Sequence, residues 1–581
     1  MNITIHLKNY RDRLFDVDGT EHIEQAQADH RPVILFLLII LFNVFYQLGK
    51  QPGWVLGGEM WAEMATNYYP NANASSYLQK LFSTDAGYIP APQRLIALVG
   101  NLINLSAASI PYFYTWSSII LTGMMVGIFC LSPFRTLVKS DWLRFLTAIS
   151  ILMVADFQTR TFINFTYFSA FFVAIVTALA LIEKSEEVPR WSWCIPILMI
   201  SKPAVLAILP AMILVAVVSQ PRFRLIAIVA VVLCIGQFLQ MFMSSTAGTM
   251  PFRANDITII SKLLATFKYF FGFLGGYVTG PSLQLNKYFL MVAGLFIFGI
   301  SFCLLIFKKN KANALIIVGL SLLFFNVLLN AFALSDLWTQ DLARLDGIPV
   351  YRHIIVGFSG CILVMCGIFS LLTDSELFKL SGRFRGDIAA LFFSVWFLSV
   401  GWFSFSGKIS KEPSSPIINN SQWQSMAVAI DSGVAPLCVP IDPWVKGANW
   451  MYQRNCGLLK SAPAWEDGHI IIKDKLSVDL EPPAILLDKT LVAAAVMVRP
   501  FSSGKTFVEV LMRIEFNDGN IRYFSGARDL NSSGGLLLLT GKEHVAIKDI
   551  SSVRLIFNLP VEIALAPDDP AGVPGIAWMG N

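Results

Sequence analysis

Runs of about twenty apolar residues recur in this chain, and they constrain its fold more than any single motif does. As a helix, each run can cross the ~30 Å hydrocarbon core of a bilayer while all its backbone hydrogen bonds are made internally. The length of 581 residues would by itself suggest several soluble domains, but hydrophobic residues make up 55% of the sequence and charged residues only 14%. We therefore predict an α-helical polytopic membrane protein, with about eleven transmembrane helices between residues 32 and 406.

Basic residues in the short connections predict the topology. The connection after the second predicted span carries Arg135, Lys139 and Arg144, and the positive-inside rule places it in the cytoplasm. The N-terminal tail, residues 1–31, then lies on the same side, and the loop after the first span, residues 49–111, lies outside. The net charge of +5 is spread over such connections, and no basic block suited to nucleic acid is present.

One apolar stretch is interrupted in its middle. Ser201-Lys202-Pro203 separates two short apolar halves, residues 191–200 and 204–218. A lysine and a proline between two such halves indicate an in-and-out hairpin whose legs do not each cross the membrane.

The amino-acid composition of the chain changes beyond residue 406. Proline, serine and asparagine dominate a linker at residues 407–421. A predicted helix, Gln422–Ile430, then precedes a turn-rich segment at 438–456, and β-branched runs alternate with turn signals from Ile470 onward. This alternation predicts an extracytoplasmic antiparallel β-sandwich or jelly roll within residues 422–581. Cys438 and Cys456 lie in this polar region, where an oxidising compartment would allow a disulfide between them.

The loop after the first span holds the acidic residues of most interest. Residues 57–94 read GGEMWAEMATNYYPNANASSYLQKLFSTDAGYIPAPQR and include Glu59, Glu63 and Asp85. Glu59 and Glu63 are four residues apart, so they share one face if this part is helical. Carboxylates at a bilayer surface, beside aromatic and basic groups, are what sugar transfer from a lipid carrier would need. An amphipathic interfacial helix with solvated acids is the alternative.

Three further segments accompany this acidic loop. They are TDAGYIPAPQRLIALVGNLI at 84–103, which has the pattern D-x-G-Y-[IL]-x-x-x-x-R, RTFINFTYFSAFF at 160–172, and VPIDPWVKGANW at 439–450. On these segments the chain resembles the GT-C superfamily of polytopic glycosyltransferases, which use polyprenyl-phosphate-linked sugars, and in particular bacterial O-antigen glucosyltransferase-like membrane proteins. Two departures leave the catalytic base open: the acidic dyad of the family is Glu-x-x-x-Glu here, and the asparagine-containing segment lacks the usual His-Trp.

The resemblance implies a GT-C-like fold and a function. We expect transfer of a hexose or pentose from a polyprenyl-phosphate donor to a glycan, lipid or protein acceptor, with inversion, at the extracytoplasmic face of a bacterial inner membrane. Because such a donor is already activated, no nucleotide-binding domain is required. Some members of the superfamily use a divalent cation, so the resemblance would allow Mg²⁺ or Mn²⁺. No metal-ligand spacing is visible, and His353 has no suitable partner.

This chemistry needs a carboxylate that takes the proton of the acceptor hydroxyl, and cations that hold the departing phosphate. The candidate bases, in order, are Glu59, Asp85 and Glu63. The candidate phosphate-binding residues, in order, are Arg94, Arg352, Arg160 and Lys202. The candidate substrate-binding residues are Tyr88, Trp61 and Asp156.

Each of these roles has a structural alternative. Arg352 would also serve as an interfacial anchor, and Asp156 and Arg160 could pair with each other. The aromatic residues of the loop would equally form an aromatic belt. For the tryptophans of the C-terminal region we favour a core over a carbohydrate platform. These are Trp423, Trp444, Trp450 and Trp465.

Two other functions remain as alternatives. An O-antigen polymerase or ligase would act on an undecaprenyl-diphosphate glycan and transfer a larger unit. A lipid-linked glycan transporter or flippase would move its substrate unchanged, but the sequence shows few intramembrane charges and no repeat of the spans.

Overall fold

The chain folds into two compact units, each built from segments that are not contiguous in sequence. We call Met1–Lys50, Leu78–Ile96 and Thr115–Ser414 the helical unit, and Gln51–Tyr77, Ala97–Tyr114 and Ser415–Asn581 the sheet unit. The predicted outer loop at 49–111 is therefore shared between the two. The computed structural model describes residues 15, 30–182, 188–243, 258–279, 286–333, 352, 355–373, 382–402, 418–569 and 573–581.

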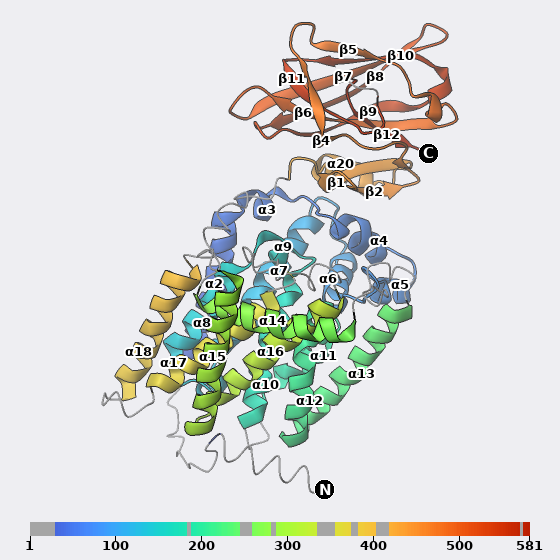
Figure 1. The fold of residues 1–581 in the computed structure, drawn as a ribbon. Coiled ribbons are helices and arrows are strands. Elements are labelled where there is room, and N and C mark those ends of the chain that lie inside the picture. The colour runs from blue at the N-terminus through green and yellow to red at the C-terminus, as the bar shows by residue number, and fades with distance from the viewer. Residues whose placement is uncertain are drawn as a thin grey trace. The chain divides into compact units, whose positions relative to one another are not determined.

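Eight helices among the described residues are long and apolar enough to cross a membrane (Figure 1). They are α2 (Arg31–Lys50), α7 (Ile110–Gly127), α10 (Ser169–Ile182) with the preceding 3-10 turn η4 (Phe165–Phe168), α13 (Pro221–Met243), α14 (Ile259–Thr279), α15 (Lys287–Phe307), α16 (Asn313–Ala333) and α17 (Ile355–Thr373). The shorter α8 (Asp141–Val154), α12 (Leu209–Val218) and α18 (Gly382–Trp396) accompany them. The mostly helical architecture with membrane-length apolar helices, predicted from the apolar runs, is confirmed.

Helix α10 is enclosed by the rest of the helical unit. Each of its residues from Ser169 to Ile182 is buried, as expected for a helix that is hydrophobic on all sides. Helix α15 is different, because it exposes large apolar side chains such as Phe289, Val292 and Phe296. Apolar groups that face outward on a helix of this length suit contact with lipid.

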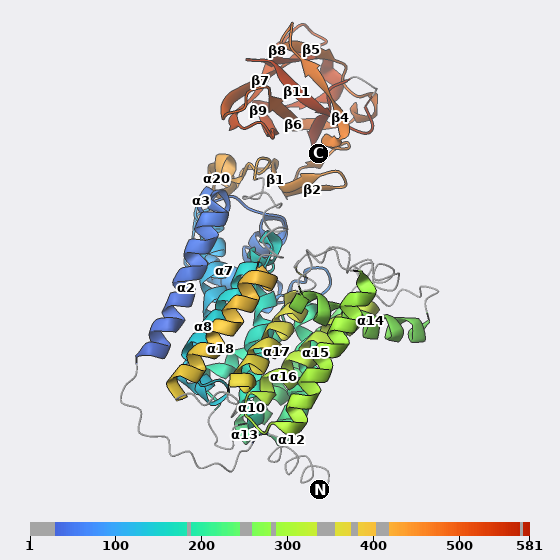
Figure 2. The same ribbon diagram turned by 60° about the vertical axis from the view of Figure 1, so that its left-hand side comes forward.

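Helices α14 and α15 lie side by side (Figure 2), and glycines let their backbones approach closely. A Cβ atom on Gly275 would lie 1.9 Å from the carbonyl oxygen of Leu290, and one on Gly294 would lie 1.8 Å from that of Phe271. Small residues of this kind are typical of helix contacts in membranes, where packing rather than the hydrophobic effect drives association.

The interruption predicted at Ser201-Lys202-Pro203 is present. The 3-10 turn η5 (Arg190–Cys194) and α11 (Ile195–Met199) lead to it, and η6 (Pro203–Ile208) and α12 lead away from it. Proline disfavours helical geometry at the residue before it, and Lys202 is accordingly extended, with φ −103° and ψ 139°. Lys202 therefore lies at the bend between two legs of an apolar hairpin.

Short helices make up most of the segment between α2 and α7. They are α3 (Pro52–Gly57), the π-helical turn η1 (Met64–Tyr68), α4 (Tyr69–Ala72), α5 (Tyr77–Phe82) and α6 (Ala91–Leu102). Glu59 precedes the helical turn that begins at Glu63, so the two glutamates do not share a helix face. We expected a shared face only if residues 59–63 were helical, and they do not form a continuous helix.

The predicted β-sheet domain is present in the sheet unit (Figure 1), and among its described residues all strand pairs are antiparallel except for one short bridge. Its strands are β1 (Leu437–Val445), β2 (Ala448–Arg454), β3 (Gly457–Leu458), β4 (Ala464–Ile472), β5 (Ser477–Leu480), β6 (Thr490–Pro500), β7 (Thr506–Phe516), β8 (Ile521–Leu530), β9 (Gly535–Ala546), β10 (Ile550–Phe557), β11 (Val561–Leu565) and β12 (Ile576–Gly580). Within the described residues, the main sheet runs β3-β12-β6-β9-β8-β7-β10-β5, and β11 joins β4 to β6.

Two apolar cores flank strand β6. One core packs β6 against β7, β10 and β11, and the other packs its opposite face near β1 and β2. Nearly every residue of β6 is therefore buried, which explains its unbroken apolar sequence LVAAAVMV. Strand β7 is covered on one face only, and its burial alternates accordingly.

Strands β1 and β2 form a separate two-stranded hairpin, preceded by helix α20 (Trp423–Asp431). We predicted the helix at this position but read the hairpin sequence as turns. A disulfide joins Cys438, near the start of β1, to Cys456, just after β2, with 5.6 Å between the Cα atoms. The hairpin is thus closed covalently at its open end.

Candidate functional site

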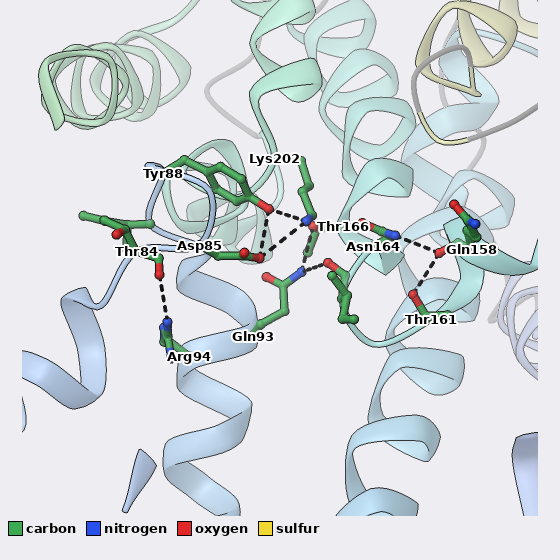
Figure 3. A network of polar contacts seen from close by, with 12 residues as sticks. Thr84, Asp85, Tyr88, Gln93, Arg94, Gln158, Thr161, Asn164, Thr166 and Lys202 are labelled. Carbon is green, nitrogen blue, oxygen red and sulfur yellow. Dashed lines mark hydrogen bonds and ion pairs between the residues drawn. The ribbon is translucent and has the colours of Figure 1, made fainter. Parts of the chain in front are cut away.

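Three candidate residues meet inside the helical unit (Figure 3). The Tyr88 hydroxyl donates to Oδ2 of Asp85 at 3.1 Å and accepts a hydrogen bond from Nζ of Lys202. The same Asp85 oxygen lies 3.9 Å from Nζ of Lys202, which makes a buried ion pair. Asp85 and Lys202 are each only 5% exposed and Tyr88 is 6% exposed. We call these residues the Asp85–Tyr88–Lys202 cluster.

A tight turn places Asp85 and Tyr88 next to each other. The Asp85 backbone N–H donates to the Tyr88 carbonyl at 2.8 Å, and the Tyr88 N–H donates to the Asp85 carbonyl at 3.1 Å. The two residues between them have positive φ, 47° for Ala86 and 85° for Gly87. This is the geometry of a type I′ turn, which brings the flanking side chains to one side. The positive φ angle that this turn requires explains why glycine stands before Tyr88 in the Asp-Ala-Gly-Tyr sequence.

Backbone contacts tie this turn to the hairpin that carries Lys202. The Ala91 N–H donates to the carbonyl of Ile200, two residues before Lys202, at 3.1 Å. The side chain of Gln237, on α13, bonds both backbone groups of Ile89, at 3.0 and 3.3 Å. The approach of the turn to Lys202 is therefore fixed on both sides.

Arg94 and Gln93 anchor the cluster from α6. The Arg94 side chain is almost fully buried, and its guanidinium donates to the carbonyls of Ser83, at 3.0 Å, and Thr84, at 3.5 Å (Figure 3). Arg94 thus holds the chain directly before Asp85. Gln93 donates through Nε2 to the carbonyl of Ile163 at 2.8 Å and to Oγ1 of Thr166 at 3.1 Å.

The contacts of Gln93 place the cluster near the start of α10. The helical segment that leads from there to Ile182 has 18 residues, which corresponds to a length of roughly 27 Å. Basic residues lie beyond its other end, where Arg222 donates to the carbonyl of Val188 at 3.0 Å. The cluster and this basic end are therefore separated by about the thickness of a bilayer core.

Asp156 directly precedes the four-residue helix α9 (Phe157–Arg160), and Arg160 is its last residue. Asp156 caps it by accepting from the Thr159 N–H at 2.8 Å, and Arg160 donates to the Leu152 carbonyl at 3.2 Å and lies over the Tyr46 ring. The charges of Arg160 and Arg352 both act on Asp156. Arg352 itself is exposed.

Glu59 belongs to the sheet unit, whereas the chain segments just described belong to the helical unit. Its Oε2 accepts from the Ser421 hydroxyl at 2.7 Å and from the Trp423 N–H, at the start of α20, at 3.0 Å. Burial raises the pKa of Glu59 to about 7, although these hydrogen bonds and the Arg528 charge act in the opposite direction. Glu59 is thus a capping group for α20.

Asp442 is a buried carboxylate that we did not select from the sequence, although it lies within VPIDPWVKGANW. It accepts from the Asn420 backbone at 3.0 Å, the Asn420 side chain at 2.8 Å and the Ser421 N–H at 2.9 Å. Burial raises the pKa of Asp442 to about 6. The Arg528 guanidinium donates to the carbonyl of Ser421 at 3.1 Å. The backbone at Asn420 and Ser421 is therefore bound by a carboxylate and by a guanidinium group.

The other candidates of the acidic loop also belong to the sheet unit. Trp61 forms a short parallel bridge with Asp442, and Glu63 is partly buried at the start of the η1 turn. Among the C-terminal tryptophans, Trp423 and Trp444 are buried core residues, as we expected. Trp450 and Trp465 are only partly buried.

The Asp85–Tyr88–Lys202 cluster combines an acceptor of protons with a cation in a largely dry setting. An ammonium group that contacts the Asp85 carboxylate is a poor neighbour for Mg²⁺ or Mn²⁺. Within the described ranges, no group of three or more histidine, cysteine, aspartate or glutamate side chains could hold a metal ion.

No family model matches this chain, and neither the curated proteins nor the solved structures with which it was compared give a match.

Proposed function

We propose that this protein is an integral-membrane glycosyltransferase, which transfers a sugar from a polyprenyl-phosphate donor to an acceptor hydroxyl. The observation that carries the proposal is the buried Asp85 carboxylate, 3.9 Å from the Lys202 ammonium and joined to it through Tyr88, inside a unit of membrane-length helices. A base and a cation side by side among helices of membrane-spanning length are what this reaction requires.

The proposed reaction is a single displacement. The acceptor oxygen attacks the anomeric carbon of the donor sugar, the bond from that carbon to the phosphate oxygen breaks, and its electron pair leaves with the polyprenyl phosphate. Asp85 takes the proton of the acceptor hydroxyl. Lys202 stabilises the negative charge that grows on the departing phosphate oxygen. Inversion at the anomeric carbon follows from a single displacement.

Before the donor binds, Lys202 is engaged with Asp85. A donor phosphate carries its own negative charge, so it competes with Asp85 for the ammonium group. Donor binding then releases the carboxylate as a base at the moment the acceptor arrives. Tyr88, which contacts both groups, maintains the hydrogen bond to Asp85 while Lys202 turns to the phosphate.

This proposal changes the order of the candidate bases. Glu59 came first because it follows the first span directly, but its Oε2 is occupied by Ser421 and Trp423. Asp85 has a cation beside it, and we therefore assign the base to Asp85. Arg94 holds the backbone before Asp85, so its role in this proposal is to position the base rather than to bind phosphate.

The position of the cluster along α10 supports reaction at the extracytoplasmic face. The end of α10 opposite to the cluster adjoins the basic residues Arg190 and Arg222. The positive-inside rule assigns such an end to the cytoplasm. On that assignment, Asp85 and Lys202 lie toward the outer leaflet, where a polyprenyl-linked sugar presents its head group after translocation.

The test uses the full-length protein in lipid nanodiscs with labelled polyprenyl-phosphate glucose, mannose or arabinose and extracted envelope acceptors. We expect release of free polyprenyl phosphate and a product heavier by one sugar. Asp85→Asn and Lys202→Met should each lower the rate by about 10²–10⁴-fold, and Tyr88→Phe by less, because it leaves both charged groups.

Matched controls are Asp387→Asn and Lys309→Met, which remove the same charges from exposed positions of the helical unit and should leave the rate unchanged. Full activity of Asp85→Asn would overturn the proposal. A product heavier by several sugars would instead indicate a polymerase or ligase, and movement of an unaltered glycolipid across the nanodisc or a liposome would indicate a transporter.

A further inference from the structure

A groove of about 640 Å³ lies in the sheet unit, between the outer-loop helices and the β1–β2 hairpin. One wall is formed by residues of η1 and α4, including Thr66 and Pro70, and the other by strand β2, including Asn449, Trp450 and Gln453. Its volume is within the range of roughly 300–1,000 Å³ that is typical of small-ligand sites.

The lining of this groove is polar but uncharged. Among the described residues that line it, no side chain carries a charge, Thr66 offers a hydroxyl, and β2, an edge strand of a two-stranded sheet, offers backbone N–H and C=O groups. Because side chains alternate along a strand, those of Asn449 and Gln453 lie on the face of β2 opposite to Trp450. Amides both donate and accept hydrogen bonds, and so do hydroxyls. This combination suits a ligand with many neutral hydroxyl groups, and it offers no cationic side chain to a phosphate or a carboxylate.

Trp450 supplies an aromatic face to the same groove. Trp423 and Trp444 are buried, and their indole N–H groups donate to the carbonyls of Ala107, at 2.6 Å, and Pro463, at 3.2 Å. Trp465 lies against the Arg499 guanidinium, 4.3 Å from its ring centroid. Trp450 is only partly buried and lines the groove. An indole face packs against the C–H groups of a sugar ring, while its edge leaves the N–H for a hydroxyl.

The wall that carries Trp450 is well fixed. The Cys438–Cys456 disulfide closes the hairpin, and Tyr452 packs edge-on against Tyr69 of the opposite wall, with 6.0 Å between the ring centroids. Both walls are therefore held before any ligand arrives, which lowers the entropic cost of binding.

We propose that this groove binds a neutral saccharide, with a sugar ring stacked on Trp450 and its hydroxyls bonded by Thr66 and by backbone groups of β2. Saccharide binding follows from the groove alone. Its identification as the acceptor glycan of the transfer reaction rests on the proposed function of the Asp85–Tyr88–Lys202 cluster.

The test measures binding by isothermal titration calorimetry on the full-length protein in nanodiscs, which avoids detergents with sugar head groups. The probes are maltotetraose, cellotetraose, mannotetraose and, as an acidic counterpart, tetragalacturonate. We expect at least one neutral tetrasaccharide to bind and the acidic one to bind at least tenfold more weakly. Trp450→Ala should weaken binding at least tenfold.

The matched control is Trp465→Ala, which removes the same side chain from a partly buried site outside the groove and should leave the affinity unchanged. Thr66→Trp fills the groove and keeps Trp450, so it should also abolish binding. It replaces Trp450→Ala as the test if that variant proves unstable. Unaltered affinity in Trp450→Ala or Thr66→Trp, or no neutral probe bound at about 10 mM, would overturn the proposal.

The same titration separates the two proposals. Asp85→Asn should lose sugar transfer and keep saccharide binding. Binding by a wild-type protein that transfers no sugar would leave the groove assignment standing while the transferase proposal fails. Sugar transfer without any saccharide binding at the groove would leave the transferase proposal standing while the groove assignment fails.

Discussion

Glu59 ionises in a buried setting, and its protonation is linked to the stability of the sheet unit. Burial raises its pKa from 4.5 to about 7, and it raises the pKa of Asp442 to about 6. A carboxyl whose pKa is higher in the folded state than in the unfolded state binds its proton more tightly when folded. Its contribution to stability is complete below the unfolded pKa and is lost as the pH rises through the folded pKa.

We therefore expect the wild-type sheet unit to lose stability between about pH 4.5 and pH 7, by roughly 3 kcal/mol from Glu59 alone. Glu59→Gln should flatten this pH dependence, and the loss that remains should follow Asp442. The measurement is the thermal unfolding midpoint of the purified protein between pH 4 and pH 8. Glu481→Gln, at an exposed position, is the control and should keep the wild-type slope. An unchanged slope in Glu59→Gln would contradict the assignment.

The candidate residues could be selected from the sequence, but their groupings could not. Asp85, Tyr88 and Lys202 entered as a base, a substrate contact and a phosphate ligand, and nothing in the sequence indicated that Lys202 reaches Tyr88, 114 positions away. Glu59 ranked first because of its place after a span. Its partner Ser421 is 362 positions distant, and such a contact depends on tertiary packing.

The turn from Asp85 to Tyr88 is the element on which the proposed site depends. Gly87 has a φ of 85°, which an L-residue adopts at a cost of about 1–2 kcal/mol, whereas Ala86 already has a φ of 47°. The two positions therefore offer a matched pair of substitutions with opposite expected signs.

Gly87→Ala should strain the turn, separate Asp85 from Lys202 and lower the transfer rate at least tenfold, with at most a small loss of global stability. Ala86→Gly should relieve strain and leave transfer close to wild type. Transfer assays and thermal unfolding of both variants check this. Equal activity in the two variants would show that the turn geometry does not position the base.

Elements governed by local chemistry were predicted well, and those governed by distant packing were not. The break at Lys202 follows from Pro203, and strands β6 and β7 follow from their apolar patterns. The β1–β2 hairpin was read as turns because Pro440 and Pro443 interrupt β1. A two-stranded sheet consists of edge strands only, and an edge strand tolerates proline where its N–H would face away from the partner.

The division of the molecule into a helical unit and a sheet unit could not be predicted from the sequence, for a similar reason. Hydropathy separates spans from polar segments, but residues 51–77 and 97–114 belong to the sheet unit through contacts with segments more than 300 positions away. Helix α6 even runs from one unit into the other. The apolar runs were sufficient to predict a helical membrane protein because a span needs no distant partner for its backbone hydrogen bonds.

At the scale of the whole molecule, the proposed reaction depends on which side of the membrane each part of the chain faces. The disulfide between Cys438 and Cys456 suits an oxidising compartment, and the basic segment at 308–311 suits the cytoplasm. We therefore expect a cysteine introduced at Asn517, an exposed position in the sheet unit, to react with a membrane-impermeant maleimide on intact cells. A cysteine at Lys309 should react only after permeabilisation.

Native thiols must not contribute to this labelling, so both variants are made in a background in which the exposed Cys194 and Cys303 are replaced by serine. The unlabelled background protein is the control. The opposite pattern would place the start of α10, and with it Asp85 and Lys202, at the cytoplasmic face. A base at that face could not meet a sugar presented in the outer leaflet, so this result would remove the transferase proposal while leaving the saccharide groove to be judged by its own titration.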